Sequence, residues 1–328
     1  MTVQPEQPQA ADPAADPAVD PSAPPRPERP PPVPLDTRLG RLIDNVRDAL
    51  LALPGYFDSK TYIEGLEAGD LFALNTVLGG TIEVQVVDTL NRIRKVWDPD
   101  DEWTEHSFER SSQSFPDVRL VARSGTTTTP ALGIELKGWY LLAKEGEPSF
   151  RYKVSPAACA EHDLLVVVPW HLKSVLSGTP IVYPPYIENA RYAAELRNYY
   201  WEHGRSFRGE KANSGIRHPD PLPTPYAPPR ARISDEAVSD SGKNFGRAAR
   251  VPGLMTDFVA EVLGKRVAGI DADNWRKFFK IYTDARDPDA VAASLIKELQ
   301  RAGHAGDDAR RITELLSELA SRFPREPR

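Results

Sequence analysis

The chain is poor in the residues that most often build disulfides, metal sites and histidine-based active sites. Its 328 residues include one cysteine, two methionines and six histidines. A single cysteine excludes an internal disulfide and a cysteine-rich zinc site, and it fits a reducing compartment. We therefore expect Cys159 to be a small buried apolar residue and the protein to be cytoplasmic. The histidines are scattered along the chain, so a histidine-based active site is not expected.

Long apolar runs and an excess of positive charge are also absent. No segment approaches the length of a membrane span, and Met1 is not followed by a basic and then apolar signal segment. The formal net charge is -6 and the pI is about 5.6, so no overall basic field favours binding to nucleic acid. Any such affinity must come from a local groove, and no membrane partner is expected.

Several common catalytic motifs are missing as well. The sequence has no G-x-x-x-x-G-K-[ST] phosphate loop, no G-x-G-x-x-G after a strand, no H-E-x-x-H and no G-x-S-x-G. The chemistries that depend on these motifs are therefore poorly supported.

Composition divides the chain into four parts. Residues 1–35 are mostly proline, alanine and acidic residues, which cannot bury enough apolar surface to offset ordering, so we expect a disordered tail. Residues 36–203 alternate apolar helical and strand patterns and form the expected core. Residues 204–250 are a proline-rich, locally basic linker or loop, and residues 251–328 show helical periodicity.

Apolar spacing and capping residues predict the individual elements of the core and of the C-terminal part. We expect the Gly79-Gly80 pair to interrupt the chain between two helices. The predicted helices cover residues 37–53, 61–74, 81–96, 155–162, 187–201, 255–267, 274–283, 288–302 and 307–323. The predicted strands outside the central hairpin cover residues 150–154 and 164–170, and the second of these is apolar throughout and therefore buried on both faces.

The central feature is a predicted hairpin between Phe115 and Tyr140. Strand side chains alternate between two faces, so one strand turns Asp117 away from its apolar neighbours and the next does the same with Glu135 and Lys137. A turn over residues 124–129 would pair the two strands and bring Asp117 beside Glu135. Two carboxylates and one ammonium group would then meet at one point.

This arrangement, Pro116-Asp117 followed by Glu135-Leu136-Lys137 on adjacent strands, resembles the PD-(D/E)xK nuclease superfamily. That superfamily contains many type II restriction endonucleases as well as repair and recombination nucleases. The resemblance covers roughly residues 78–183 and concerns motif and strand context. It implies an α/β fold with a restriction-endonuclease-like core, in which a mixed central sheet is flanked by helices, followed here by a helical C-terminal region.

The resemblance also implies a function. Asp117 and Glu135 would bind Mg2+, or Mn2+ as a substitute, and Lys137 would place or polarise the attacking water. The expected substrate is double-stranded DNA, the expected assembly is a homodimer, and a cognate DNA methyltransferase would complete a restriction system. A catalytically inactive DNA-binding or defence-assembly subunit and a repair or recombination nuclease remain alternatives. The plain structural interpretation is that Glu135 and Lys137 belong to the solvated face of an edge hairpin.

Six further residues are candidates for the site or for DNA contact. Glu83 lies on the helix before the Pro-Asp strand, where the superfamily often carries a glutamate, although an acid early in a helix is equally favoured by the helix dipole. The remaining candidates are basic side chains beside aromatic residues on the helix 187–201, a stripe that packs equally well as a core face, and in the glycine-containing loop 241–250, which suits phosphate contact or a solvated surface. They are Arg191, Arg197, Lys243, Arg247 and Arg250.

Overall fold

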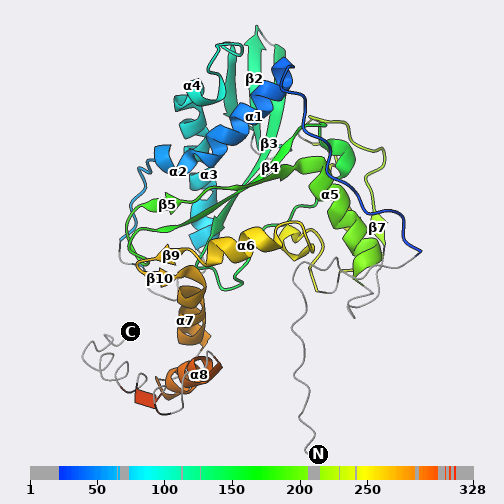
Figure 1. The fold of residues 1–328 in the computed structure, drawn as a ribbon. Helices are drawn as coiled ribbons and strands as arrows, with labels where there is room; N and C mark the ends of the chain where they lie inside the picture. The colour runs from blue at the N-terminus through cyan, green and yellow to red at the C-terminus, as the bar shows by residue number, and fades with distance from the viewer. Residues whose placement is uncertain are drawn as a thin grey trace, which may run out of the picture.

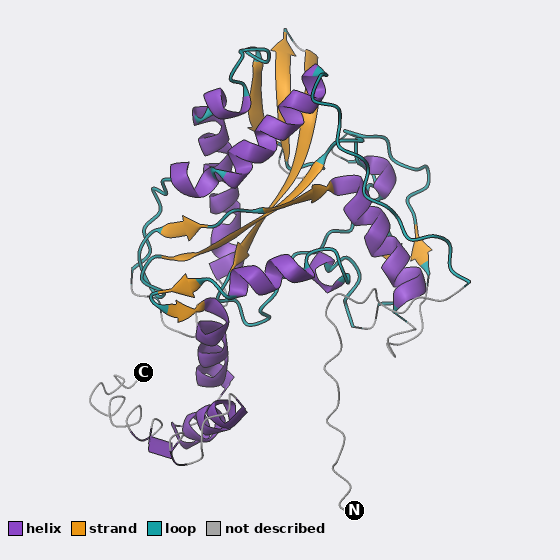
Figure 2. Ribbon diagram, viewed as in Figure 1, coloured by secondary structure: helices purple, strands orange, loops and turns teal. Residues whose placement is uncertain are grey.

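The structure is a computed structural model of the chain. It describes residues 22–64, 66, 74–111, 114–125, 127–205, 215–228, 230–240, 242–284 and 288–301, together with residues 307, 310, 311 and 314. These residues form an α/β fold with a mixed, curled sheet, helices against it, and a helical region at the C-terminal end (Figures 1 and 2).

Six strands of the described chain form the central sheet. They are β1 (His106–Arg110), β2 (Val118–Ser124), β3 (Thr127–Tyr140), β4 (Leu164–Leu172), β5 (Pro180–Val182) and β6 (Tyr186–Asn189). β1, β2 and β3 run antiparallel in that order, and β4 joins β3 in parallel. β6 pairs with the first half of β4 and β5 with its last residues. The predicted hairpin is therefore the middle of a larger sheet, and β1 was not predicted from the sequence.

The hairpin follows the predicted alternation of side chains. Val118 pairs with Ile134 and Leu120 with Leu132, and all four side chains are buried. β4 is buried along its whole length, as its unbroken apolar run predicts for a strand covered on both faces. This packing places the apolar faces of β2 and β3 in the core and leaves the other face for polar residues.

The helices of the N-terminal part cover one side of the sheet. α1 (Arg38–Leu51) begins where the Thr37 hydroxyl accepts a hydrogen bond from the backbone N–H of Gly40, so Thr37 is the cap among the two residues, Asp36 and Thr37, that the sequence offers for this role. α2 (Leu53–Tyr56) and α4 (Arg94–Trp97) are single turns. α3 (Leu74–Arg92) packs against β3 and β1.

The predicted break at Gly79-Gly80 is wrong, because α3 runs through both glycines. A Cβ atom placed on Gly138 of β3 would lie 3.5 Å from the Cα of Gly79, an ordinary van der Waals distance, so the helix lies directly against the strand at this point. The packing of α3 against β3 and β1 thus outweighs the loss of helix stability at each glycine, which is about 1 kcal/mol. The predicted helix 61–74 also fails at its start. Residues 61–64 are irregular, Ile63 bridges to Gly178, and most of the remainder lies outside the described residues.

Two predictions between β3 and α5 also need correction. Residues 150–154 form no strand of the main sheet. Their backbone pairs instead with the later loop, through Tyr152 N–H to the Gly246 carbonyl and Asp235 N–H to the Lys153 carbonyl. The predicted helix 155–162 is only one 3-10 turn, Pro156–Ala158. Local propensity was overridden here by contacts with residues some 80 positions away in the sequence, which sequence spacing does not reveal.

α5 (Ala190–Tyr199) starts later than predicted. Residues 187–189 belong to β6, and the Asn189 side chain caps the helix by accepting from the N–H of Tyr192. A π-helical turn, Tyr200–Gly204, follows. α5 lies beside the chain that follows the 3-10 turn, and Arg191 donates a hydrogen bond to the Cys159 carbonyl. Cys159 itself is fully buried, as predicted.

The C-terminal part contains the predicted helices with small shifts. α6 (Thr256–Leu263) is followed by the short pair β9 (Arg266–Val267) and β10 (Ile270–Asp271), by α7 (Ala272–Asp284) and by α8 (Pro288–Arg301). α7 and α8 project away from the sheet (Figure 1). Most of the predicted helix 307–323 lies outside the described residues. None of the helices in the described part of the chain is both long and apolar enough to span a bilayer.

Parts of the predicted tail and linker contact the core. Residues 1–21 and 206–214 lie outside the described residues. From Ser22 the chain is extended, and Arg29 forms an ion pair with Glu188 of β6 at 2.7 Å. The described part of 215–250 buries Asp235 and Phe245. A few ionic and aromatic anchors therefore hold the described parts of both proline-rich segments to the core, and the expectation of a disordered tail does not hold for residues 22–35.

Candidate active site

The candidate site lies where β2 separates from β3. The last paired residues at this end are Val118 and Ile134, and β3 continues beyond them beside β4 alone. Asp117 precedes Val118, and Glu135 and Lys137 follow Ile134 on the face opposite the apolar one. The predicted meeting of these three residues is therefore produced by the fork between the two strands.

The three side chains are in direct contact. Lys137 Nζ lies 2.6 Å from Asp117 Oδ2 and 2.8 Å from Glu135 Oε1. The backbone N–H of Asp117 donates to Glu135 Oε2 at 3.3 Å. The two carboxylates and the ammonium group thus form one connected cluster, with Lys137 between the acids.

Burial controls the charge of the two strand residues. It raises the pKa of Glu135 to about 7, because the neighbouring Lys137 only partly offsets the loss of water around the carboxylate. Burial by itself lowers the pKa of Lys137, but the two carboxylates raise it by more, so its pKa lies above the ordinary value. Lys137 is therefore positively charged at neutral pH, whereas Glu135 is poised between its protonated and charged forms.

Glu83 of α3 reaches the same cluster from the edge that β2 vacates. It accepts a hydrogen bond from the backbone N–H of Gly138, and the charges of Lys137 and Asp117 act on it. Burial raises the pKa of Glu83, and Asp117 raises it further, while Lys137 and Arg110 oppose the rise. The Arg110 guanidinium of β1 lies 3.4 Å from Glu83. Sequence reasoning missed Arg110 because the strand that carries it was not predicted.

The cluster has the donor atoms that suit Mg2+. Mg2+ usually takes one or two protein carboxylates and keeps several water or phosphate ligands, and Asp117 and Glu135 offer carboxylate oxygens on one side of a fork. Among the described residues, no three His, Cys, Asp or Glu side chains are arranged to hold one ion by themselves. The buried Glu135 carboxylate, compensated by a single ammonium group, is a group that a second cation would stabilise.

The basic residues predicted to contact DNA are not gathered at one surface. Arg197 is only 2% exposed, donates to the carbonyls of Tyr152 and Val154, and pairs with the fully buried Asp235 at 2.7 Å. Its assignment to DNA contact is wrong, because Arg197 is buried and joins α5 to two other segments, residues 152–154 and Asp235. Arg191 is partly buried and is held by its hydrogen bond to Cys159.

The loop candidates have a mixed environment. Arg247 and Arg250 both pair with Glu147, which follows β3. Lys243 is exposed, and its ammonium group has no ion-pair partner among the described residues. Two of the three loop cations are therefore already paired with an acid of the same chain.

No protein-family model matches the chain, and no curated protein matches its sequence.

Proposed function

We propose that the protein is a Mg2+-dependent DNA endonuclease of the type II restriction kind, with a restriction-endonuclease-like core. The observation that supports this proposal is the contact among Asp117, Glu135 and Lys137 at the fork between β2 and β3. The order of antiparallel β1, β2 and β3 followed by parallel β4, with α3 ahead of them, is also compatible with the superfamily core that the sequence motif suggests.

Each residue has a defined role in this proposal. A bound Mg2+ supplies Lewis-acid polarisation of the scissile phosphate and lowers the pKa of water. Asp117 and Glu135 provide its carboxylate ligands, for which Glu135 must lose its proton. Lys137 leaves its ion pairs in part, donates a hydrogen bond to the attacking water, and stabilises negative charge that grows on the phosphate oxygens. Glu83 keeps the open edge of β3 in place and adds negative charge beside the site.

The DNA duplex approaches the fork from the polar side of β3. Lys243, an exposed cation in the loop 242–250, would contact phosphates there. Arg247 and Arg250 would contact phosphates only when their ion pairs with Glu147 break. A homodimer would place two such sites on opposite strands, since one site cuts one strand. Light scattering of the protein with and without DNA tests this assembly, and a monomer in both conditions contradicts it.

Cleavage of unmodified plasmid DNA by the purified protein, with Mg2+ or with a chelator, tests the function. We expect discrete fragments only with Mg2+, and none from Asp117→Asn or Glu135→Gln, both of which should still bind DNA. Glu109→Gln is the matched control, because Glu109 is also an acid of this sheet but pairs with Arg123 at an exposed position. It should cut like the wild type.

The other outcomes separate the alternatives. DNA binding without cleavage of any unmodified DNA would favour an inactive DNA-binding or defence-assembly subunit. Smears or structure-specific nicks would favour a repair or recombination nuclease. A gene for a DNA methyltransferase beside this one would support the restriction assignment.

A further inference from the structure

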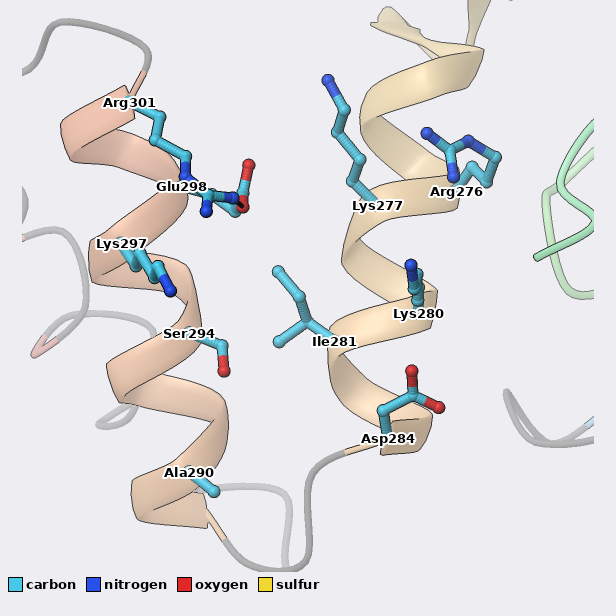
Figure 3. Close-up of a pocket in the computed structure, with 10 residues that line it drawn as sticks. All are labelled: Arg276, Lys277, Lys280, Ile281, Asp284, Ala290, Ser294, Lys297, Glu298 and Arg301. Atoms are coloured by element: carbon cyan, nitrogen blue, oxygen red, sulfur yellow. Dashed lines mark hydrogen bonds and ion pairs between the residues drawn. The ribbon is translucent and has the colours of Figure 1, made fainter. Parts of the chain in front are cut away.

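The helical hairpin of α7 and α8 contains a groove that lies outside the candidate active site. The groove has a volume of about 730 Å³ and runs between the two helices (Figure 3). Half of its ten lining residues are basic and two are acidic. The basic residues are Arg276, Lys277, Lys280, Lys297 and Arg301.

Helical periodicity places some of the lining residues on facing surfaces of the two helices. On α7, Lys277, Ile281 and Asp284 are spaced by four and three residues and so lie on one face, and on α8 the same holds for Ser294 and Lys297. Figure 3 shows Ile281 directed towards α8 and Lys297 directed towards α7. Basic side chains therefore line the groove between the two helices and also lie on the outer surface of the hairpin.

The acids near the groove are already used. Asp284 pairs with Lys144, and Glu298 pairs with Arg301. At the base of α7, Asp273 is shared by Arg276 and Lys277 at 2.6 and 2.7 Å.

Two cations of the groove remain. The ammonium groups of Lys280 of α7 and Lys297 of α8 have no hydrogen-bond or ion-pair partner within the part of the chain that the structure describes. One lies on each helix, so the two walls of the groove both present an ammonium group to an incoming anion.

The hairpin is also tied to the chain that follows β3, the strand that carries the candidate site. Arg276 donates to the carbonyl of Lys144 at 3.2 Å, and its side chain covers Gly146. Lys144 follows Lys137 by seven residues, which span at most about 25 Å even when fully extended. One turn of B-form DNA is about 34 Å long. The base of the hairpin is therefore within one helical turn of the site.

We propose that the α7–α8 groove binds the phosphate backbone of a nucleic-acid duplex, in continuation of the duplex held at the fork. The choice of a duplex rests on the proposed function. An acidic peptide is the less suitable occupant, because peptide binding in a helical groove depends on apolar anchors, and only Ile281 and Ala290 are apolar among the lining residues. Charged walls without apolar pockets suit hydrated, sequence-independent phosphate contact.

The test measures binding of the full-length protein to a fluorescently labelled duplex of 30 base pairs by anisotropy, in chelator, over a range of NaCl concentrations. In the double variant Lys280→Ala/Lys297→Ala, loss of two phosphate contacts should reduce the slope of log affinity against log salt by about 1.8, and weaken binding on the order of tenfold at low salt, on every sequence alike. The matched control is Lys95→Ala/Lys265→Ala, which removes two exposed lysines that pair with acids outside the groove. The control should keep the wild-type slope.

An unchanged slope in the groove variant, with the wild-type unfolding midpoint, would overturn the proposal. So would equal losses in the groove and control variants, since these would indicate a diffuse charge effect. If the groove variant kept the duplex affinity and salt slope of the wild type but bound labelled poly-glutamate more weakly, the groove would be a site for acidic polypeptides and the proposal would fail. The proposed nuclease function fails separately, through absence of Mg2+-dependent cleavage by the wild type, because the binding assay contains no metal.

Discussion

The ammonium group of Lys137 lies 2.6 Å from a carboxylate oxygen of Asp117, although 20 positions separate the two residues in the sequence. The contact crosses from β3 to the start of β2, and Glu135 closes the cluster from the same strand as Lys137. Two partly buried carboxylates thus share one cation, and the pKa values of Glu135 and Lys137 both depend on this contact.

Removal of Lys137 should therefore change both activity and charge. In Lys137→Ala, two neighbouring carboxylates lose their common partner, so the pKa of Glu135 should rise further above its wild-type value of about 7. Mg2+-dependent cleavage should be abolished while Mg2+ binding at alkaline pH persists. Single-turnover cleavage and metal titration by calorimetry measure the two effects. Full cleavage activity in this variant would mean that the hairpin is ordinary structure.

The raised pKa of Glu135 predicts how stability depends on pH. Between the ordinary value of 4.5 and about 7, the folded state holds a proton that the unfolded state has lost, so the free energy of unfolding should fall as pH rises through this window. At 1.36 kcal/mol per pKa unit, the total contribution is about 3 kcal/mol. Urea unfolding of the wild type and of Glu135→Gln at pH 5, 6, 7 and 8 without metal checks this, since the variant should lack that fall. Parallel curves for the two proteins would contradict it.

The same titration should appear in catalysis. Because the charged carboxylate is the form that binds a cation, cleavage at low Mg2+ should increase from pH 6 to pH 8 and then level off. A higher Mg2+ concentration should move the midpoint to lower pH, since the ion stabilises the charged form. Initial cleavage rates at two Mg2+ concentrations measure the shift. A midpoint that is independent of Mg2+ would assign the titration to another group.

Two substitutions of Glu83 separate its structural contribution to cleavage from its electrostatic one. Glu83→Ala should reduce cleavage by about 10- to 100-fold, as expected for a residue that supports a metal site. Glu83→Gln keeps an acceptor for the Gly138 N–H but removes the charge. If Glu83 acts only by holding the edge of β3, the glutamine variant should recover the activity. A loss in both variants, with unchanged unfolding midpoints, would assign the effect to charge at the site.

Arg197 should matter for stability and not for DNA affinity. Arg197→Ala leaves the fully buried Asp235 without its guanidinium partner, which typically costs about 3–5 kcal/mol. Arg250→Ala is the control, because Arg250 pairs with Glu147 at an exposed position and should cost less than about 1 kcal/mol. Urea unfolding compares the two. The salt dependence of DNA binding should be unchanged in any Arg197 variant that remains folded, and a reduced slope would restore this residue as a phosphate contact.

The sequence by itself determined the parts that depend on local periodicity. Alternation along Phe115–Tyr140 predicted a hairpin that brings Asp117 beside Glu135. The hairpin pairs as far as Val118 and Ile134, and just beyond them the N–H of Asp117 donates to the Glu135 carboxylate. The burial of β4 could also be predicted from its unbroken apolar run, and the start of α1 from the capping residues before it. In each case the side-chain pattern of a few consecutive residues fixes which face is buried, and neighbours far along the chain do not change the result.

Only the tertiary structure decided the features that depend on distant contacts. α3 continues through Gly79 because it packs along β3, where Gly79 lies against Gly138. Arg197 became a core residue because Asp235, 38 positions later, is buried against it, and an arginine beside aromatic residues reads the same in a core as on a DNA-binding surface. Arg110 came to Glu83 through a strand that its short, polar sequence did not predict. Burial, partner and charge state of these groups follow from packing between segments, which residue spacing along one segment does not encode.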